Sequence, residues 1–317
     1  MAGLNRIPPR LRSGLRIAAA LAVVAGTAAA VGVEPFLHGL ATISPATILA
    51  AAALAGVATA AAAWRWRIVS AGFGLPLRWS EAFASYYRSQ FLNTVLPGGV
   101  VGDVHRAYVH GQRHRRIDLA ARAVAAERVA GQLVQIVLTL AILLPLGMAS
   151  PLAPLAWISG AIAVLAIVVV GVVAATRRGR AALGREYRML RPVITRPAAL
   201  CAIAAASVVV VAAHAATFVV ASLAAGVDAG ADELAVVALI VLGAAAIPVN
   251  VGGWGPREAV AAAAFALAGL GAAAGVAVST AFGVLTVVAV LPGALALLAG
   301  RFRSLPARGI IGKRRSA

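Results

Sequence analysis

The sequence predicts an all-α membrane protein, a bundle of about six to eight transmembrane helices with one or two re-entrant hairpins interrupted by glycine and proline. The first observation is composition: 62% of the 317 residues are hydrophobic and 12% are charged, whereas soluble domains are about 45–50% apolar and about 25% charged. The second is that several uncharged runs reach the roughly 20 residues that a helix needs to cross a bilayer. These runs are residues 17–33, 43–63, 129–146, 155–175, 198–225 and 276–299.

The third observation is where the charges lie. The formal net charge is +18, but a nucleic-acid-binding domain displays its basic face on a soluble body, so no nucleic-acid partner is expected. Basic blocks between apolar runs are typical of cytoplasmic loops. We therefore expect a multi-pass protein of the cytoplasmic (inner) membrane with both termini in the cytoplasm. The blocks are residues 6–16, 65–78, 106–116, 177–196 and 301–315.

The chain divides into a basic cytoplasmic N-terminal tail, one transmembrane domain and a basic cytoplasmic C-terminal tail, at residues 1–16, 17–300 and 301–317. The first span, residues 17–33, leads to a short outer loop around Glu34. The second span, residues 43–63, ends at a belt of alternating tryptophan and arginine, residues 64–67, which is typical of the membrane interface.

The stretch 81–118 is irregular. Its apolar part, residues 82–96, is short and ends at Pro97. If this part crossed the membrane, the arginine blocks at 106–116 and 177–196 would both lie outside. We therefore predict a re-entrant hairpin, followed by a cytoplasmic loop that carries residues 106–116.

The remaining elements follow the same logic. An acidic outer loop around Asp228 precedes two short apolar segments, which cross twice or form a second hairpin. Either arrangement leaves the C-terminal tail inside. The expected helices are residues 119–146, 155–175, 198–225 and 276–299, and the short segments are residues 234–247 and 259–270 around the irregular stretch 248–258.

The two irregular stretches share a pattern in which a short apolar segment leads through proline and clustered glycines to an acidic and a basic residue. Paired, interrupted segments of this kind indicate a transporter's binding site; the alternative is that both are packing breaks. Each turn precedes a predicted helix, whose free N–H groups favour an anion. With Arg106 near one turn and Arg257 in the other, we expect a lipid phosphate as the ligand, unless both arginines extend to the headgroups.

Several ionisable residues are further candidates. Asp103 and Arg106 are three residues apart and should pair on one helix face, whereas the adjacent Arg257 and Glu258 are expected to need separate partners. Glu127 lies either about 12 Å inside its helix, as a functional candidate, or at the inner interface. The glutamines at 132 and 135 favour a polar interior face below it.

No metal or cofactor is expected. Cys201 is the only cysteine, and no nucleotide-binding motif is present. Three histidines in the predicted basic loop lack neighbouring carboxylates at ligand spacing, and a fourth, His214, is expected to be a hydrogen-bonded packing residue. The loop histidines are His105, His110 and His114, and the aromatic residues expected at the interface are Trp64, Trp66, Trp79, Tyr86 and Tyr87.

Three segments, YYRSQFLNTVLPGGVVGDVHRAYVHGQ, AARAVAAERVAGQ and IPVNVGGWGPREAVAAAAFALAG, resemble the signature blocks of the flippase-like family formed by the transmembrane region of lysylphosphatidylglycerol synthase and its stand-alone relatives of the YbhN type. The resemblance spans most of the chain in hydropathy order. It is carried by Asn93, Pro97, Gly98, Gly102, Asp103, Arg106, Glu127, Arg128, Pro248, Gly253, Gly255, Arg257 and Glu258.

The resemblance implies movement or handling of a phospholipid, an aminoacylated lipid or a polyprenyl-linked glycolipid. In the fused family member a separate cytosolic domain makes the lipid; this chain ends at Ala317 without room for one, so we expect no lipid synthesis and a possible cytosolic partner enzyme. The alternatives are an accessory subunit of an envelope lipid pathway and a membrane-embedded lipid-modifying enzyme with Asp103, Glu127 or Glu258 as general base. The expected binding residues are Asn93, Pro97, Gly98, Gly99, Gly102, Asp103, Arg106, Glu127, Arg128, Gly252, Gly253, Gly255, Arg257 and Glu258.

Overall fold

The computed structural model describes residues 21, 24–96, 99–143, 145, 168, 171–172, 174–245 and 254–303. These residues form helices and no strand. Four of the helices are long and apolar enough to cross a membrane, or five spans if the bent pair Val24–Val31 and Glu34–Ala41 counts as one. The predicted class, a polytopic membrane helix bundle, is confirmed. The predicted span at 155–175 lies largely outside the described residues, whereas the described part of the predicted span 17–33 includes the helical segment Val24–Val31.

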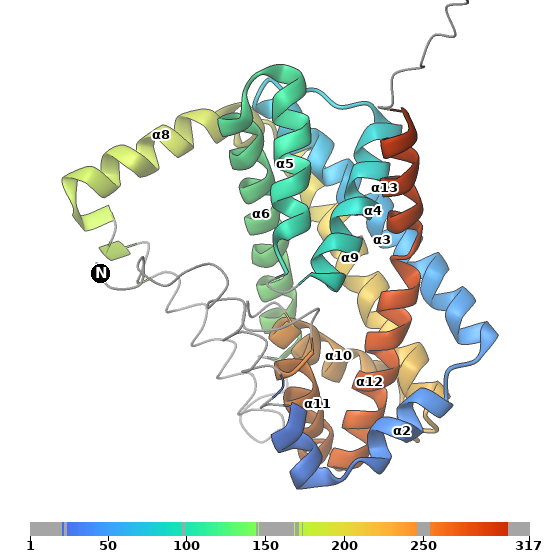
Figure 1. Cartoon of the computed structure of the whole chain (residues 1–317). Coiled ribbons are helices and arrows are strands. Elements are labelled where there is room, and N and C mark those ends of the chain that lie inside the picture. Colours follow the sequence, from blue (N-terminus) through green and yellow to red (C-terminus); the bar gives the residue numbers. More distant parts are fainter. Residues whose placement is uncertain are drawn as a thin grey trace, which may run out of the picture.

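The four long helices form the frame of the bundle (Figure 1). Helix α3 packs along α9, and α6 lies against both. The last span consists of two consecutive helices, which are separated by Val290 and Leu291. The frame consists of α3 (Pro45–Gly72), α6 (Ile117–Leu143), α9 (Pro197–Ala224), α12 (Ala272–Ala289) and α13 (Pro292–Arg303).

The first short apolar segment forms a helical hairpin. Helix α4 (Trp79–Val95) runs from the end of the bundle where α3 ends toward its middle, and α5 (Val101–His114) returns beside it (Figure 1). The hairpin therefore begins and ends on the same side, as predicted. The loop predicted over residues 106–116 is wrong, because most of it continues α5 as a helix that packs on α6.

A second pair of short helices lies toward the opposite end of the bundle. Helix α10 (Ala231–Ala245) packs on α9 and on α11 (Pro256–Leu267), and α11 packs on α12. Most of the connection between α10 and α11, with the predicted Pro248, Gly252 and Gly253, lies outside the described residues.

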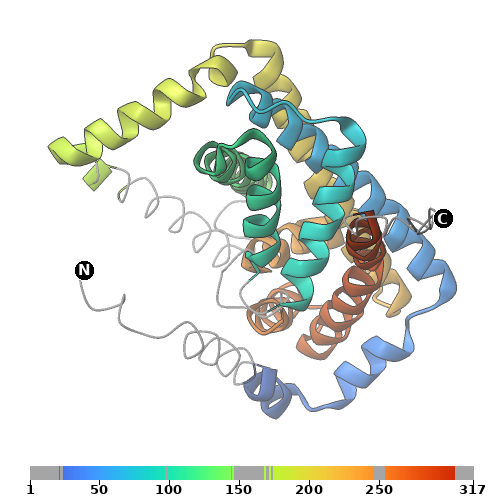
Figure 2. The same cartoon turned by 45° about the horizontal axis from the view of Figure 1, so that its top comes forward.

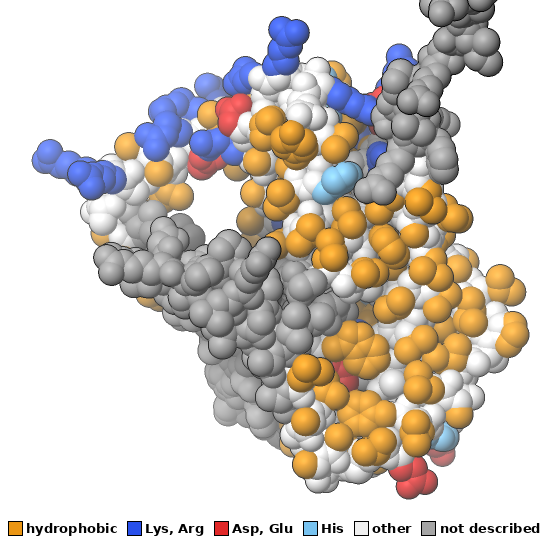
Figure 3. Space-filling view, viewed as in Figure 1, with side chains coloured by type: hydrophobic (Ala, Val, Ile, Leu, Met, Phe, Trp, Pro, Cys, Tyr) orange, Lys and Arg blue, Asp and Glu red, His pale blue; other side chains and the backbone are white. Residues whose placement is uncertain are grey.

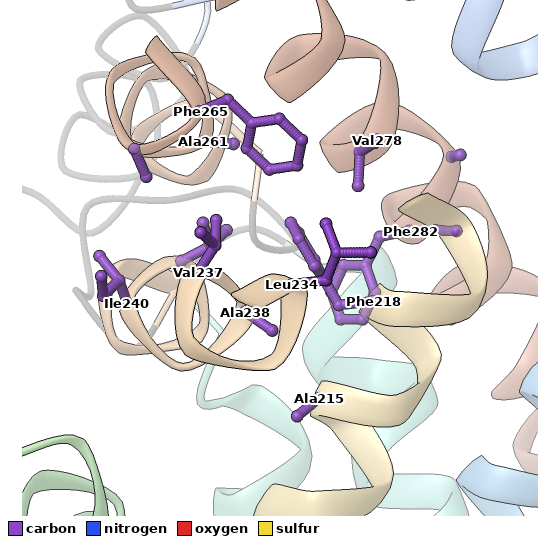
Figure 4. Packing of buried hydrophobic residues seen from close by; sticks show 14 of the residues in the cluster. Ala215, Phe218, Leu234, Val237, Ala238, Ile240, Ala261, Phe265, Val278 and Phe282 are labelled. Carbon is purple, nitrogen blue, oxygen red and sulfur yellow. The ribbon is translucent and has the colours of Figure 1, made fainter. Parts of the chain in front are cut away.

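The core between these helices is apolar (Figure 4). Phe218 of α9 contacts Phe265 of α11 and Phe282 of α12 through ring pairs with centroids 6.2 and 5.6 Å apart. Leu234 and Val237 of α10 are fully buried in the same cluster. This packing ties the second pair of short helices to the frame.

Charge separates along the bundle (Figure 3). Arg113 and Arg116 lie where α5 meets α6, and Asp228 and Asp232 lie between α9 and the start of α10. The arginine block predicted as a loop is instead helix α8 (Arg177–Ile194), which projects from the basic end in both views (Figures 1 and 2). Both arginine blocks therefore share one end of the bundle, as the hairpin prediction required.

The predicted outer loop around Glu34 is also wrong. It forms helix α2 (Glu34–Ala41), which is bent by 100° from the preceding helical segment and packs on α12. Gly39 allows this contact, because a Cβ at that position would overlap the carbonyl oxygen of Ala277.

Candidate functional site

A buried ion network lies where α3, α4, α5, α6 and α9 meet. Glu127 of α6 is its centre, and its side chain has no exposed surface. Its Oε1 accepts from Arg65 Nε at 2.8 Å and from the Tyr86 hydroxyl at 3.1 Å, and its Oε2 accepts from Arg106 Nη2 at 2.7 Å. Glu127 is buried within the bundle, ten residues after Ile117, where α6 begins; its depth in the membrane stays a prediction.

Asp103, in the first turn of α5, is the second carboxylate of the network. It accepts from Arg106 Nε at 3.0 Å, which confirms the predicted pair. It also accepts from Ser89 Oγ at 3.2 Å, from Asn93 Nδ2 at 3.4 Å and from Arg128 Nη2 at 2.8 Å. Asp103 thus links the α4–α5 hairpin to α6.

Gly102 sets how closely the two arms of the hairpin approach. A Cβ at this position would overlap the carbonyl oxygen of Ser89 on α4, so no other residue allows this spacing without a shift of backbone. The Gly102 N–H, which would otherwise be a free donor at the helix N-terminus, donates to Asn93 Oδ1 at 2.7 Å. The turn is therefore closed by the protein's own side chains.

Arg106 is fully buried between aromatic rings. Its Cζ lies 4.9 Å from the centroid of Trp66 and 4.6 Å from that of Tyr86, a cation–π geometry. Its Nη1 has no hydrogen-bond partner among the described residues. The prediction that Trp66 and Tyr86 are interfacial anchors is wrong, because both are buried, whereas Trp64 and Trp79 are exposed.

A second buried cluster lies at the start of α11. Arg257 Nη2 donates to Glu258 Oε1 at 2.6 Å, and Ser279 Oγ of α12 lies 3.2 Å from the same oxygen. Glu258 Oε2 accepts from the Gly255 N–H at 2.6 Å. The prediction that Arg257 and Glu258 need separate partners is wrong, because Glu258 folds back to cap its own helix and this brings its carboxylate to the long guanidinium side chain.

The two clusters share an architecture. In each, a carboxylate in the first turn of a short helix is held by a buried arginine and a serine of a neighbouring helix, and the arginine lies over aromatic rings. Arg257 Cζ is 5.1 Å from the Trp254 centroid and 5.4 Å from that of Phe282. The sequence similarity of the two irregular stretches thus has a counterpart in their structure.

A cavity of about 350 Å³ adjoins the first cluster. Arg128 enters it from α6, and 46% of its side-chain surface is exposed. Polar groups of the wall come from α3, α4, α6, α9 and α12. They are Arg65, Tyr86, Gln90, Asn93, Thr94, Gln132, Gln135, Ser207, His214 and Thr286.

The predicted site residues fall into four sets relative to this cavity. Asn93, Gly99 and Arg128 line it. Gly102, Asp103, Arg106 and Glu127 belong to the network behind its wall. Gly255, Arg257 and Glu258 form the separate second cluster. Pro97, Gly98, Gly252 and Gly253 lie outside the described residues.

Sequence reasoning missed several residues of the wall. Arg65 was assigned to the interfacial belt, but α3 continues to Gly72 and carries Arg65 into the interior, where its Nη1 donates to Ser207 Oγ at 2.9 Å. The predicted polar face below Glu127 is confirmed, because Gln132 and Gln135 both line the cavity. His214 is hydrogen-bonded as predicted, because its Nδ1 lies 2.7 Å from the Val210 carbonyl oxygen. Its side chain also lines the cavity.

The three histidines predicted in a loop lie on helix α5 instead. His110 is buried, and its Nε2 is 3.2 Å from Ser70 Oγ and 3.3 Å from the Leu75 carbonyl oxygen. These contacts link the hairpin to the end of α3. Within the described ranges no three His, Cys, Asp or Glu side chains gather as a metal site.

The chain was compared with known protein families. The family model described as lysylphosphatidylglycerol synthase TM region matches residues 14–293, which include the α4–α5 hairpin, the pair α10 and α11, and the whole ion network. No curated protein matches the chain.

Proposed function

Because the chain belongs to the lysylphosphatidylglycerol synthase TM region family, we propose that it binds the phosphate headgroup of a membrane lipid in the cavity beside Arg128 and moves that lipid between leaflets. Family membership supports a membrane protein of a lipid-related pathway. The cavity supports the finer proposal, since a polar hollow inside a helix bundle can hold a headgroup away from the acyl chains.

The observation that carries the proposal is the position of Arg128. It lies eleven residues after Ile117, about 16 Å along α6 at 1.5 Å per residue, so it is well inside that helix. Its guanidinium is held on one side by Asp103 and reaches the cavity on the other. An arginine can bind two phosphate oxygens at once.

This geometry changes the roles expected for two arginines. Neither Arg106 nor Arg257 is among the residues that line the cavity, and each is held by buried carboxylates. We assign them to positioning: Arg106 and Glu127 hold α5 against α6, and Asp103 orients Arg128. The phosphate contact falls to Arg128, with Asn93 and the glutamines of the wall beside it.

We further propose that the basic end of the bundle faces the cytoplasm of a cytoplasmic membrane, because basic residues are retained on that side. The sequence has no nucleotide-binding motif, so lipid would move passively, with an ion gradient, or toward a reaction that consumes it. A cytosolic lipid-synthesising enzyme is a suitable partner.

The test is transfer in liposomes that contain the purified protein and a trace of head-labelled phospholipid, whose outer-leaflet fraction is destroyed by an impermeant reductant. Wild-type protein should expose the inner-leaflet label within the assay, and Arg128→Ala should reduce the rate at least about tenfold, or about 1.4 kcal/mol. Arg122→Ala is the matched control, because Arg122 lies on the same helix in an exposed pair with Glu186. Absence of transfer for every lipid tried, or full transfer by Arg128→Ala, would refute the proposal.

The enzyme alternative has weaker support. A general base needs a free carboxylate within reach of the substrate, and Asp103, Glu127 and Glu258 are each bound by arginine. We therefore propose that the chain is not an enzyme. Lipid extracts of overexpressing cells check this, since a modifying enzyme would change lipid masses and a translocator would not.

A further inference from the structure

We infer that the cavity selects a lipid whose headgroup is a net anion, a phosphate ester or diester without an ammonium group, over aminoacylated and choline-type lipids. The inference rests on the proposed function only in that the cavity must bind a lipid headgroup. It adds the charge class of that headgroup.

The first argument is the charge of the network. Three guanidinium groups, of Arg65, Arg106 and Arg128, face two carboxylates, of Asp103 and Glu127, which leaves a net charge of +1. The excess lies at the cavity, because Arg106 and Glu127 have no exposed side-chain surface and Arg128 is 46% exposed. The excess charge gives the cavity a positive potential, which attracts an anionic headgroup and repels a cationic one.

The second argument is what the wall lacks. Among the residues known to line the cavity there is no carboxylate, and its ionisable members are Arg65, Arg128, Tyr86 and His214. Asp103 bonds two residues of the wall, Asn93 and Arg128, but only 12% of its side chain is exposed, and it also accepts from Arg106 and Ser89. A ligand ammonium group would find no free carboxylate in the described wall, and it would be repelled by Arg128.

The third argument is what the wall offers. Gln132 lies one turn after Arg128 on α6, where residues i and i+4 are neighbours, and its side chain is exposed to the cavity. Amide N–H groups of Gln90 and Gln132 can donate to phosphate oxygens, and their carbonyl oxygens can accept from hydroxyl groups. A phosphate ester with a polyol or sugar beyond it satisfies both kinds of group.

The test measures binding rather than transfer, so that its outcome is separate from that of the proposed function. Delipidated protein is given equal amounts of phosphatidylglycerol, lysylphosphatidylglycerol and phosphatidylcholine with identical acyl chains, together with a polyprenyl phosphate, and the retained lipids are counted by native mass spectrometry. We expect the two anions to be retained at least about tenfold over the two ammonium lipids. The ratio of retained phosphatidylglycerol to retained polyprenyl phosphate then shows which of the two kinds of anionic lipid the cavity prefers.

Two variants assign the preference to the cavity. Gln132→Glu places a carboxylate beside Arg128 without removing any ion pair of the network, and it should reduce the preference for anions by about tenfold; Gln132→Lys, which changes the same position, should keep or increase it. Equal retention of all lipids, a preference for lysylphosphatidylglycerol, or the same selectivity in both variants would overturn the inference. Selective binding without leaflet transfer would instead overturn the proposed function alone.

Discussion

Arg106 Nη2 lies 2.7 Å from Glu127 Oε2, and neither side chain has any exposed surface. The pair joins α5, the returning arm of the first hairpin, to the long helix α6. Removal of one partner of a buried ion pair destabilises the protein strongly, because the other partner is left as an uncompensated charge in a medium of low dielectric constant. The hairpin should therefore depend on this pair for its position.

Removing the charge of Glu127 tests this dependence. Glu127→Gln would remove the carboxylate that pairs with Arg65 and one of the two carboxylates that pair with Arg106. We expect the free energy of unfolding to fall by about 3–5 kcal/mol. Thermal unfolding of the purified protein in detergent measures the change. Glu186→Gln is the matched control, because the exposed pair with Arg122 is worth about 0–1 kcal/mol; equal, small effects of both variants would contradict the prediction.

Gly102→Ala should separate the two arms of the hairpin. The added methyl group would overlap the Ser89 carbonyl oxygen, which is backbone and cannot rotate away, so α5 must shift and Asp103 with it. We expect a loss of roughly 1–3 kcal/mol together with reduced lipid transfer. Gly56→Ala on α3 makes only ordinary contact, with the Tyr87 hydroxyl, and it should unfold at or above the wild-type temperature; a Gly102→Ala protein as stable as this control would refute the argument.

Much of the fold could be predicted because hydropathy is a local property. The spans α3, α6 and α9 follow from uncharged runs, and the Asp103–Arg106 pair follows from their spacing on one helix face. Arg65 could not be placed in this way. Its partner Glu127 lies 62 residues away, and an arginine after an apolar run looks the same whether it meets headgroups or a buried carboxylate.

The same reason explains the errors in the site. The sequence indicated that Arg106 and Arg257 were important, but their charge is used within the protein, and only tertiary packing distinguishes such an arginine from one that meets a ligand. Arg128 was included in the predicted site without a role of its own. Its role emerges from Asp103, which holds one side of its guanidinium and leaves the other open.

The direction of the hairpin is tested by labelling single cysteines from each side of the membrane. With Cys201 replaced, Arg78→Cys, just before α4, and Arg116→Cys, just after α5, should react with an impermeant thiol reagent from the same side, and Asp228→Cys from the opposite side, because the hairpin returns to the end from which it entered. The cytoplasmic side is expected for the two arginine positions. Reaction of Arg78→Cys and Arg116→Cys from opposite sides would show that α4 or α5 crosses completely.

The second cluster should affect stability without affecting lipid selectivity, because neither Arg257 nor Glu258 lines the cavity. Arg257→Met and Glu258→Leu should each destabilise the protein by about 3–5 kcal/mol, since each leaves one buried charge unpaired, whereas the double variant replaces both charges by apolar groups of similar size and should recover part of the loss. Recovery should be incomplete, because the Gly255 N–H loses its acceptor in Glu258.

The measurement is a double-mutant cycle on thermal or denaturant unfolding, with a coupling of about 0.5–3 kcal/mol expected between the two positions. The ratio of anionic to ammonium lipids retained by each folded variant provides the independent readout and should equal that of the wild type. Additive losses would mean that the pair is not coupled. An altered lipid ratio would mean that the second cluster reaches the ligand, and the headgroup would then have to lie between the two clusters rather than beside Arg128 alone.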